Sequence, residues 1–189
     1  MSVKQSLLAM LDDGPRYGAQ LRAEFENRTG GTWPLNVGQV YTTLARLERD
    51  GFVTNEGEDD GGHVLYAITD DGRAVVHEWF ATPVDRVAPE RDELAIKLAF
   101  AVTVPGIDIS RVVAKQRAAT VGALQDYTRL KDRLMDSPDE LPWLLVLDSL
   151  VFAAEAEVRW LDHIEARVAR AAAQREDRPA TTPRKAVVR

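Results

Sequence analysis

The order of hydrophobic patterns over residues 3–81 constrains the fold more than any other feature of the sequence. Apolar residues first recur every three or four positions, as in amphipathic helices, and then give way to two β-rich runs around an acidic, glycine-rich turn. The predicted elements are helices over 3–11, 17–29 and 36–49, strands over 52–55 and 63–68, a turn over 56–62 and a fourth helix over 69–81. Three helices followed by a two-stranded ribbon is the order of a winged helix-turn-helix.

The second half of the chain has the pattern of longer helices. It predicts a linker over 82–92, a helical domain over 93–173 with helices over 93–102, 108–135 and 141–173, and a disordered basic tail over 174–189. On the last helix, apolar residues alternate spacings of three and four, as in a coiled coil. These residues are Leu144, Leu147, Val151, Ala154, Val158 and Leu161. Such a broad stripe favours dimerisation through these helices, and a closed monomeric three-helix bundle is the alternative. The expected fold is therefore mainly α with a small β-wing.

Composition limits the cellular location and the binding partners that we expect for this chain. The 189 residues include no cysteine, which excludes disulfides and thiol chemistry, and we expect no signal peptide or membrane span, hence a cytoplasmic protein. The net charge is −6, with residues 1–80 at −6 and residues 170–189 at +4. Because the overall charge opposes nucleic-acid binding, any DNA-binding function must depend on where a few cations lie.

The sequence gives little support for catalysis, a metal or a cofactor. Its three histidines lie far apart, and His77-Glu78 lacks the second histidine of a zinc-protease motif because the required position is Ala81. The acidic run from Glu56 to Asp60 lacks the ligand spacing of a calcium loop and is better explained as a solvated turn. We therefore expect no enzyme activity and no bound cofactor.

The helix predicted over 36–49 carries the most specific signal. Asn36 and Gln39 predict a capping box at its start, and Val40, Leu44 and Leu47 form its buried stripe. The opposite face then presents short polar groups and one arginine: Gln39, Thr42, Thr43 and Arg46. Such a set can enter a major groove and contact base edges. A plain solvated face is the alternative, although that would favour Glu and Lys over two threonines.

Four segments resemble the PadR family of transcriptional regulators. They are Leu7-Leu8-Ala9-Met10-Leu11 through Gly14-Pro15-Arg16-Tyr17-Gly18-Ala19-Gln20-Leu21, the run from Val37 to Val53, Tyr66-Ala67-Ile68-Thr69-Asp70-Asp71-Gly72-Arg73, and Arg91-Asp92-Glu93-Leu94-Ala95-Ile96-Lys97-Leu98. The last looks like the start of the longer type of C-terminal domain. The resemblance covers roughly residues 3–170 and implies a dimeric repressor that binds double-stranded DNA and is released by a small aromatic or drug-like effector.

The resemblance also implies roles for individual residues. Tyr17 and Tyr41 would contact the DNA backbone, Lys4 would contact a phosphate, and the four face residues would face the bases. Asn36, at the helix start, is a further DNA-binding candidate. Two departures stand out. Many members have Ser and Pro where this chain has Gln39 and Thr42, and the turn of the wing, usually basic, is Asp59-Asp60-Gly61-Gly62-His63 here. An acidic turn weakens phosphate binding, and His63 is either a phosphate contact or an inert surface residue.

Aromatic residues of the later helices are candidates for an effector site. The candidates are Trp79, Trp143, Phe152 and Trp160, which could stack on a flat ligand. Ordinary core or interface packing is the alternative. Trp33, in the loop before the third helix, is expected to pack and so to set the angle of that helix. The function that the sequence favours is sequence-specific DNA binding, most simply repression, as a homodimer on an inverted repeat. A winged-helix module that binds another protein is the alternative.

Overall fold

A computed structural model describes residues 3–84, 92–135 and 137–176. The chain divides into two compact units, one comprising residues 1–87 and 134–146 and the other residues 88–133 and 147–189. Residues 134–146, which the sequence pattern groups with the helical domain, thus cluster with the first unit. Most of the linker expected over 82–92 and most of the tail expected over 174–189 lie outside the described residues.

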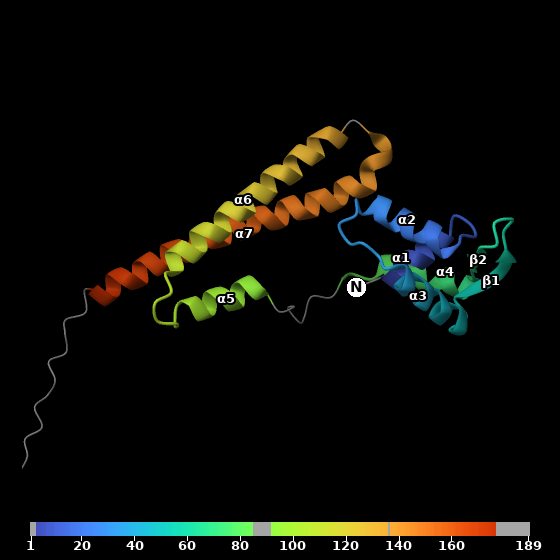
Figure 1. Ribbon diagram of the computed structural model, residues 1–189, viewed down its shortest axis with the longest axis horizontal. Helices are drawn as coiled ribbons and strands as arrows, with labels where there is room; N and C mark the ends of the chain where they lie inside the picture. Colours follow the sequence, from blue (N-terminus) through green and yellow to red (C-terminus); the bar gives the residue numbers. More distant parts are fainter. Residues whose placement is uncertain (1–2, 85–91, 136, 177–189) are drawn as a thin grey trace, which may run out of the picture. The chain divides into compact units, whose positions relative to one another are not determined.

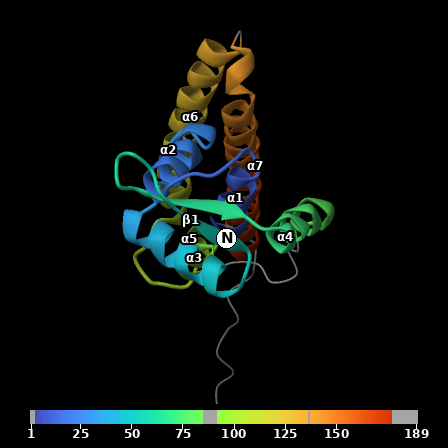
Figure 2. The same ribbon diagram turned by 90° about the vertical axis from the view of Figure 1, so that its right-hand side faces the viewer.

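The first unit has the predicted element order. It consists of α1 (Val3–Leu11), α2 (Gly18–Arg28), α3 (Val37–Arg49), β1 (Val53–Glu58), β2 (Val64–Ile68) and α4 (Asp70–Ala81). The core is formed by the predicted apolar faces, with Leu7, Leu21, Val40, Leu44 and Leu47 fully buried. Because β1 and β2 are antiparallel neighbours, they form the ribbon that ends in the wing turn, away from α4 (Figures 1 and 2). The mainly α fold with a small β-wing is confirmed.

The wing differs in detail from the prediction. The first strand continues to Glu58, whereas the sequence predicts its end at Asn55. An irregularity between Asn55 and Glu58 makes this extension possible, and Gly57 adopts a φ of +92° there. Since glycine is the residue that adopts this conformation without a Cβ penalty, it bends the strand and does not end it.

The cap of α3 also differs in part from expectation. The N–H of Gly38 donates to Asn36 Oδ1 over 2.8 Å, so Asn36 caps α3 as predicted. No return bond from Gln39 to the Asn36 N–H is present among the described residues, and the predicted capping box is wrong. The return bond occurs instead at α2, where the N–H of Tyr17 donates to Gln20 Oε1 over 3.1 Å. Gln39 is therefore left exposed on the outer face of α3.

The second unit is built from the remaining long helices. Its elements are α5 (Glu93–Ala101) and most of α6 (Ile109–Leu134) and of α7 (Leu141–Glu176), while the 3-10 turn η1 (Pro138–Glu140) belongs to the first unit. Contacts show that α6 and α7 are antiparallel, because Lys131 pairs with Asp148 whereas Arg117 pairs with Asp162 (Figure 1). Leu147, Ala154 and Leu161 of the predicted seam are buried. No helix within the described ranges is long and apolar enough to cross a membrane.

Candidate nucleic-acid interface

The outer face of α3 carries the predicted polar set. Gln39, Thr42 and Arg46 are exposed and Thr43 is half-buried, while the buried stripe lies on the opposite side. Both threonine hydroxyls donate to the helix itself, Thr42 to Gly38 O and Thr43 to Gln39 O, over 2.7 Å each. Because their protons are engaged, the threonines offer methyl groups and acceptor lone pairs outward, whereas Gln39 and Arg46 supply the donors.

Lys4 of α1 lies beside this face. Its Nζ is 3.8 Å from an Asp50 carboxylate oxygen and 4.5 Å from the centre of the Phe52 ring. A hollow of about 370 Å³ separates Lys4 from α3 and is lined by Gln39, Thr43 and Arg46 as well. Lys4, which the family resemblance points to, is therefore adjacent to the candidate base contacts. Sequence reasoning missed Asp50 as its partner because the two residues are 46 positions apart.

Tyr17 and His63 lie against one another although they are far apart in the sequence. Their rings stack with centroids 4.4 Å apart and planes 14° from parallel. Arg16 brings them together, because it pairs with Tyr66 of β2 in an isolated bridge of two 3.0 Å backbone hydrogen bonds. The residue that follows Arg16 is thereby fixed beside the wing. His63 thus stacks on Tyr17 in the folded chain, while its side chain remains half exposed.

Asp59 organises the wing turn. Its Oδ1 accepts hydrogen bonds from the N–H groups of Gly61 and His63, both over 2.9 Å, and lies 3.1 Å from His63 Nδ1. The His63 N–H is the main cause that holds the pKa of the Asp59 carboxyl below its ordinary value. The acidic wing predicted as a weakness for DNA binding thus has one carboxylate engaged in its own turn, and Asp60 remains exposed.

Tyr41 is set by a close approach to α2. A Cβ added to Gly18 would lie 2.8 Å from two atoms of the Tyr41 ring, so only glycine leaves space for this ring. Tyr66 is half-buried close by, and burial raises its pKa, with the charges of Glu48 and Tyr41 adding to the effect. The start of α2 therefore positions both tyrosines, because Tyr17 directly precedes this helix and the Tyr41 ring lies against Gly18, its first residue. The glycine that follows Tyr17 was the sequence signal for this contact.

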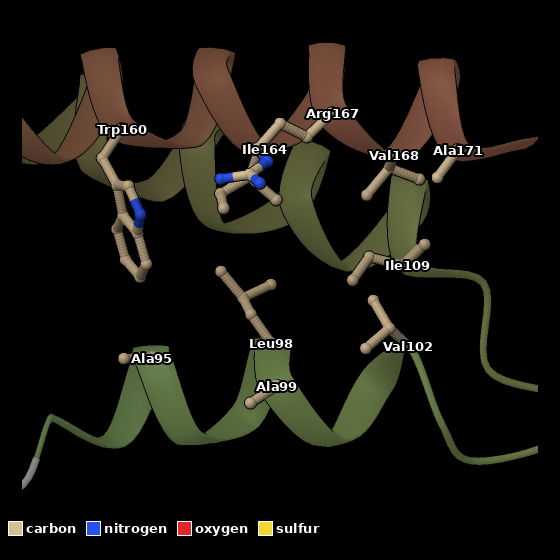
Figure 3. A pocket seen from close by; sticks show the side chains of 10 residues that line it. All are labelled: Ala95, Leu98, Ala99, Val102, Ile109, Trp160, Ile164, Arg167, Val168 and Ala171. Carbon is tan, nitrogen blue, oxygen red and sulfur yellow. The ribbon is translucent and has the colours of Figure 1, made fainter.

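The four aromatic effector candidates lie in different environments. Trp160 lines an apolar pocket of about 380 Å³ between α5 and α7 (Figure 3), whereas Phe152 of α7 is 65% exposed. In the first unit, Trp79 packs on Phe80 with ring centres 4.7 Å apart, and Trp143 lies against Gly30. Trp33, in the loop before α3, is 45% exposed, so more than half of its surface is covered. Among the described residues, no cluster of three His, Asp or Glu side chains could hold a metal ion.

Known transcriptional regulators resemble this chain over most of its length. The sequence profile of the Transcriptional regulator PadR-like family matches residues 7–78, and that of the Virulence activator alpha C-term family matches residues 90–169. A probable transcriptional regulator of Mycobacterium tuberculosis is 27% identical over 183 residues, covering 87% of this chain and 96% of that protein. The negative transcriptional regulator PadR of Bacillus subtilis is 23% identical, covering 88% and 97%.

Solved structures agree on the fold. B. subtilis PadR in complex with operator DNA is 24% identical, has a TM-score of 0.70 and matches 89% of this chain and 99% of its own. The same protein in complex with p-coumaric acid gives a TM-score of 0.71, covering 88% and 98%. The fold and the exposed face of α3 thus define a winged helix-turn-helix transcriptional regulator. The chain belongs to the PadR-like family, with the longer C-terminal domain, as its motifs indicated.

Proposed function

We propose that this regulator is a repressor that binds DNA sequence-specifically as a homodimer, with α3 of each protomer in the major groove of an inverted repeat. The observation that carries the proposal is the outer face of α3, where Gln39, Thr42, Thr43 and Arg46 lie beside Lys4. Arg46 has no ion-pair partner within the described part of the chain, so its guanidinium is available to a guanine edge. The B. subtilis relative is named a negative regulator and has been solved with operator DNA, which supports this proposal.

The tyrosines and Lys4 are assigned to the DNA backbone. Tyr17 and Tyr41 carry hydroxyls on rings that neighbouring residues hold in place, which suits contacts that fix orientation. Lys4 can exchange the 3.8 Å ion pair with Asp50 for a phosphate. Asn36 belongs to this set through its position at the start of α3. His63 contributes through Tyr17.

The second protomer is assigned to the helical half. Phe100 of α5 and Phe152 of α7 are more than 60% exposed in a single chain, which is costly for large apolar side chains unless a partner covers them. A homodimer presents two α3 helices, so the half-sites should lie about one helical turn, roughly 10 bp, apart. Because the regulator acts on chromosomal DNA, we assign it to the cytoplasm. We assign no catalytic step to it.

A response to a small effector completes the proposal. The B. subtilis relative has been solved with p-coumaric acid, and the second unit of this chain contains an apolar pocket beside Trp160. We assign effector binding to a small molecule that shifts the dimer between states with different DNA affinity.

Fluorescence anisotropy with the region upstream of the gene tests DNA binding, at two salt concentrations and with excess random DNA. We expect binding that survives the competitor and weakens steeply with salt, since log K falls by about 0.9 per neutralised phosphate for each unit of log salt. Arg46→Ala should cost about 1–3 kcal/mol and relax one position of the site. Arg129→Ala, an exposed arginine of α6 paired with Asp126, is the matched control and should bind normally.

A protein-interaction module is the second candidate, because residues 1–80 carry a net charge of −6. The same experiment separates the two functions. Binding that is insensitive to salt, or an equal loss for Arg46→Ala on every DNA sequence, would contradict specific recognition by α3. Absence of binding to any selected genomic fragment, with folded dimeric protein, would favour the protein partner.

A further inference from the structure

The carboxylate of Asp50, which follows the last residue of α3, is engaged by two cations from different elements. Its Oδ1 accepts hydrogen bonds from Arg49 Nε over 2.9 Å and from Arg49 Nη2 over 2.8 Å. Its Oδ2 lies 3.8 Å from Nζ of Lys4 in α1. The side chains of Lys4, Arg49 and Asp50 are 40%, 72% and 33% exposed, so a DNA backbone can reach all three. One carboxylate thus holds two cations at the edge of the candidate interface.

The same carboxylate lines the hollow beside the candidate base contacts. Four residues at helical spacing on α3 border this hollow of about 370 Å³ together with Lys4, and they are Gln39, Thr43, Arg46 and Asp50. A phosphate that approaches the hollow therefore meets a negative charge as well as the donors of the polar face. Neither Asp50 nor Arg49 was a candidate for DNA recognition from the sequence.

These ion pairs should lower affinity for random DNA more than affinity for a matching sequence. Binding to random DNA is almost entirely electrostatic, so it depends on cations that phosphates can engage. A duplex whose base edges do not match α3 is not held in one position, and Lys4 and Arg49 stay with the carboxylate. Where Gln39 and Arg46 contact matching bases, the backbone is fixed beside the hollow, and phosphates replace the carboxylate. Because exposed ion pairs contribute little to stability, this exchange costs little.

We propose that Asp50 is a specificity-determining residue, which withholds Lys4 and Arg49 from random DNA and releases both to the phosphates of the operator. A repulsive group can separate right from wrong partners as effectively as an attractive contact. At about 0.15 M salt, a slope of about 0.9 per neutralised phosphate corresponds to roughly fivefold in affinity for each cation that is freed. The operator half of this role rests on the proposed sequence-specific function, whereas the other half concerns random DNA alone.

Fluorescence anisotropy over a series of salt concentrations tests this role, with a random-sequence duplex and the DNA fragment upstream of the gene as probes. Asp50→Asn removes the charge at nearly constant shape. Its affinity for the random duplex should rise roughly 5- to 25-fold and its salt slope by about 0.9–1.8, because one or two cations are freed. Affinity for the upstream fragment should change less than about threefold, since its phosphates already engage both cations in the wild type. Asp12→Asn, whose carboxylate pairs with Arg73 over 3.0 Å beyond the other end of α1, is the matched control and should change neither affinity more than about twofold.

Substitution of the two cations shows whether they act through Asp50. Lys4→Gln and Arg49→Gln should each weaken binding to the upstream fragment roughly fivefold, while binding to the random duplex changes less than about twofold. In the Asp50→Asn background, each substitution should also weaken binding to the random duplex roughly fivefold. A merely structural role of Asp50 would not move the salt slope on random DNA.

Three outcomes would overturn the role of Asp50. The first is an unchanged affinity and salt slope of Asp50→Asn on the random duplex, and the second is an equal gain on both DNAs, which would show that the carboxylate does not discriminate between them. The third is a loss of affinity for the upstream fragment, which would make Asp50 an attractive contact of its own. A wild-type protein that prefers no selected genomic fragment over random DNA would instead contradict the proposed sequence-specific function, and the random duplex tests Asp50 in that case as well.

Discussion

At the scale of single residues, the interface depends on contacts between positions that are distant in the sequence. The sequence identified Tyr17, Tyr41, Lys4 and His63 as candidates, but it could not indicate that two of them stack on each other. The stack requires the bridge between Arg16 and Tyr66, which is a property of the folded chain. The same holds for Asp50, whose carboxylate lies 3.8 Å from Lys4 Nζ although the two residues are far apart in the sequence.

His63 is predicted to act on DNA affinity through Tyr17. His63→Ala removes the 4.4 Å ring stack and should weaken operator binding about three- to tenfold, because Tyr17 loses its orientation. His63→Phe keeps the stack and should restore most of the affinity. Anisotropy on the same operator measures both. If His63→Phe is as weak as His63→Ala, the ring nitrogens contact DNA directly and the positioning role is wrong.

The wing turn is predicted to loosen at acid pH. The pKa of Asp59 is lowered in the folded state, so its carboxylate stabilises the turn above its ordinary value of 3.8, and this stabilisation is lost as pH falls through the lower folded value. NMR shifts of the Gly61 and His63 amides should follow this titration. Asp59→Asn should flatten it, and Asp60→Asn, at the neighbouring exposed position, should leave it intact. An unchanged profile in Asp59→Asn would contradict the assignment.

Gly18 is predicted to be needed for the position of Tyr41. Gly18→Ala places a Cβ 2.8 Å from the outer atoms of the ring, so the exposed Tyr41 side chain must turn aside; this should weaken DNA binding while stability changes by no more than about 0.5 kcal/mol. Gly122→Ala on α6 is the control, since nothing lies within 4 Å of its added Cβ, and should be neutral or stabilise by about 1 kcal/mol. Urea denaturation measures both. Unchanged DNA binding in Gly18→Ala, measured by anisotropy, would show that the position of Tyr41 does not matter for the interface.

At the scale of elements, the sequence predicted most helices to within a few residues. The spacing of apolar residues, the capping residues and the helix-breaking residues all indicate the same helix ends. Thr69 caps α4 and Asp92 caps α5, since each side chain accepts a hydrogen bond from a backbone N–H of the first turn. The end of β1 was missed because glycine is typical of both turns and bulges, and only pairing with β2 decides between them. The missing capping box has a similar origin, since a glutamine at the third helical position can equally well remain in solvent.

The pairing of α6 with α7 includes a polar contact that the apolar seam did not indicate. Glu157 of α7 accepts hydrogen bonds from Gln116 and Thr120 of α6, and Thr120 is only 7% exposed. Glu157→Ala should destabilise the protein by about 1–2 kcal/mol, because hydrogen bonds to charged groups are worth about 1.5–3 kcal/mol and this site is partly solvated. Glu157→Gln keeps an acceptor and should recover part of the loss. Glu165 is an exposed glutamate of α7, so Glu165→Ala should leave the free energy of unfolding in urea unchanged. If it lowers this free energy as much as Glu157→Ala does, the hydrogen bonds of Glu157 do not stabilise the helix pair.

At the scale of the whole molecule, the sequence indicated two parts but not that residues 134–146 cluster with the first of them. The helical period of apolar residues continues along α7 without a break. The sequence therefore does not show where along α7 the first unit ends and the second begins. The sequence could nevertheless predict a dimer, because the apolar stripe on α7 is wider than the other helices of one chain can cover. Phe152 is its most informative member, because a single chain leaves it 65% exposed.

Phe152→Ser is accordingly predicted to dissociate the dimer while each chain keeps its fold. Loss of a large buried aromatic at an interface typically costs about 2–4 kcal/mol, or roughly 30- to 1,000-fold in the dimer dissociation constant. Affinity for the inverted repeat should fall with it, because two linked α3 helices no longer bind together, whereas affinity for one half-site should not change. Sedimentation and anisotropy on both DNAs measure this, with Arg159→Ser as an exposed control on the same helix. A variant that stays dimeric would place the interface elsewhere, and a monomer that retains full affinity for the repeat would show that dimerisation does not contribute to operator recognition.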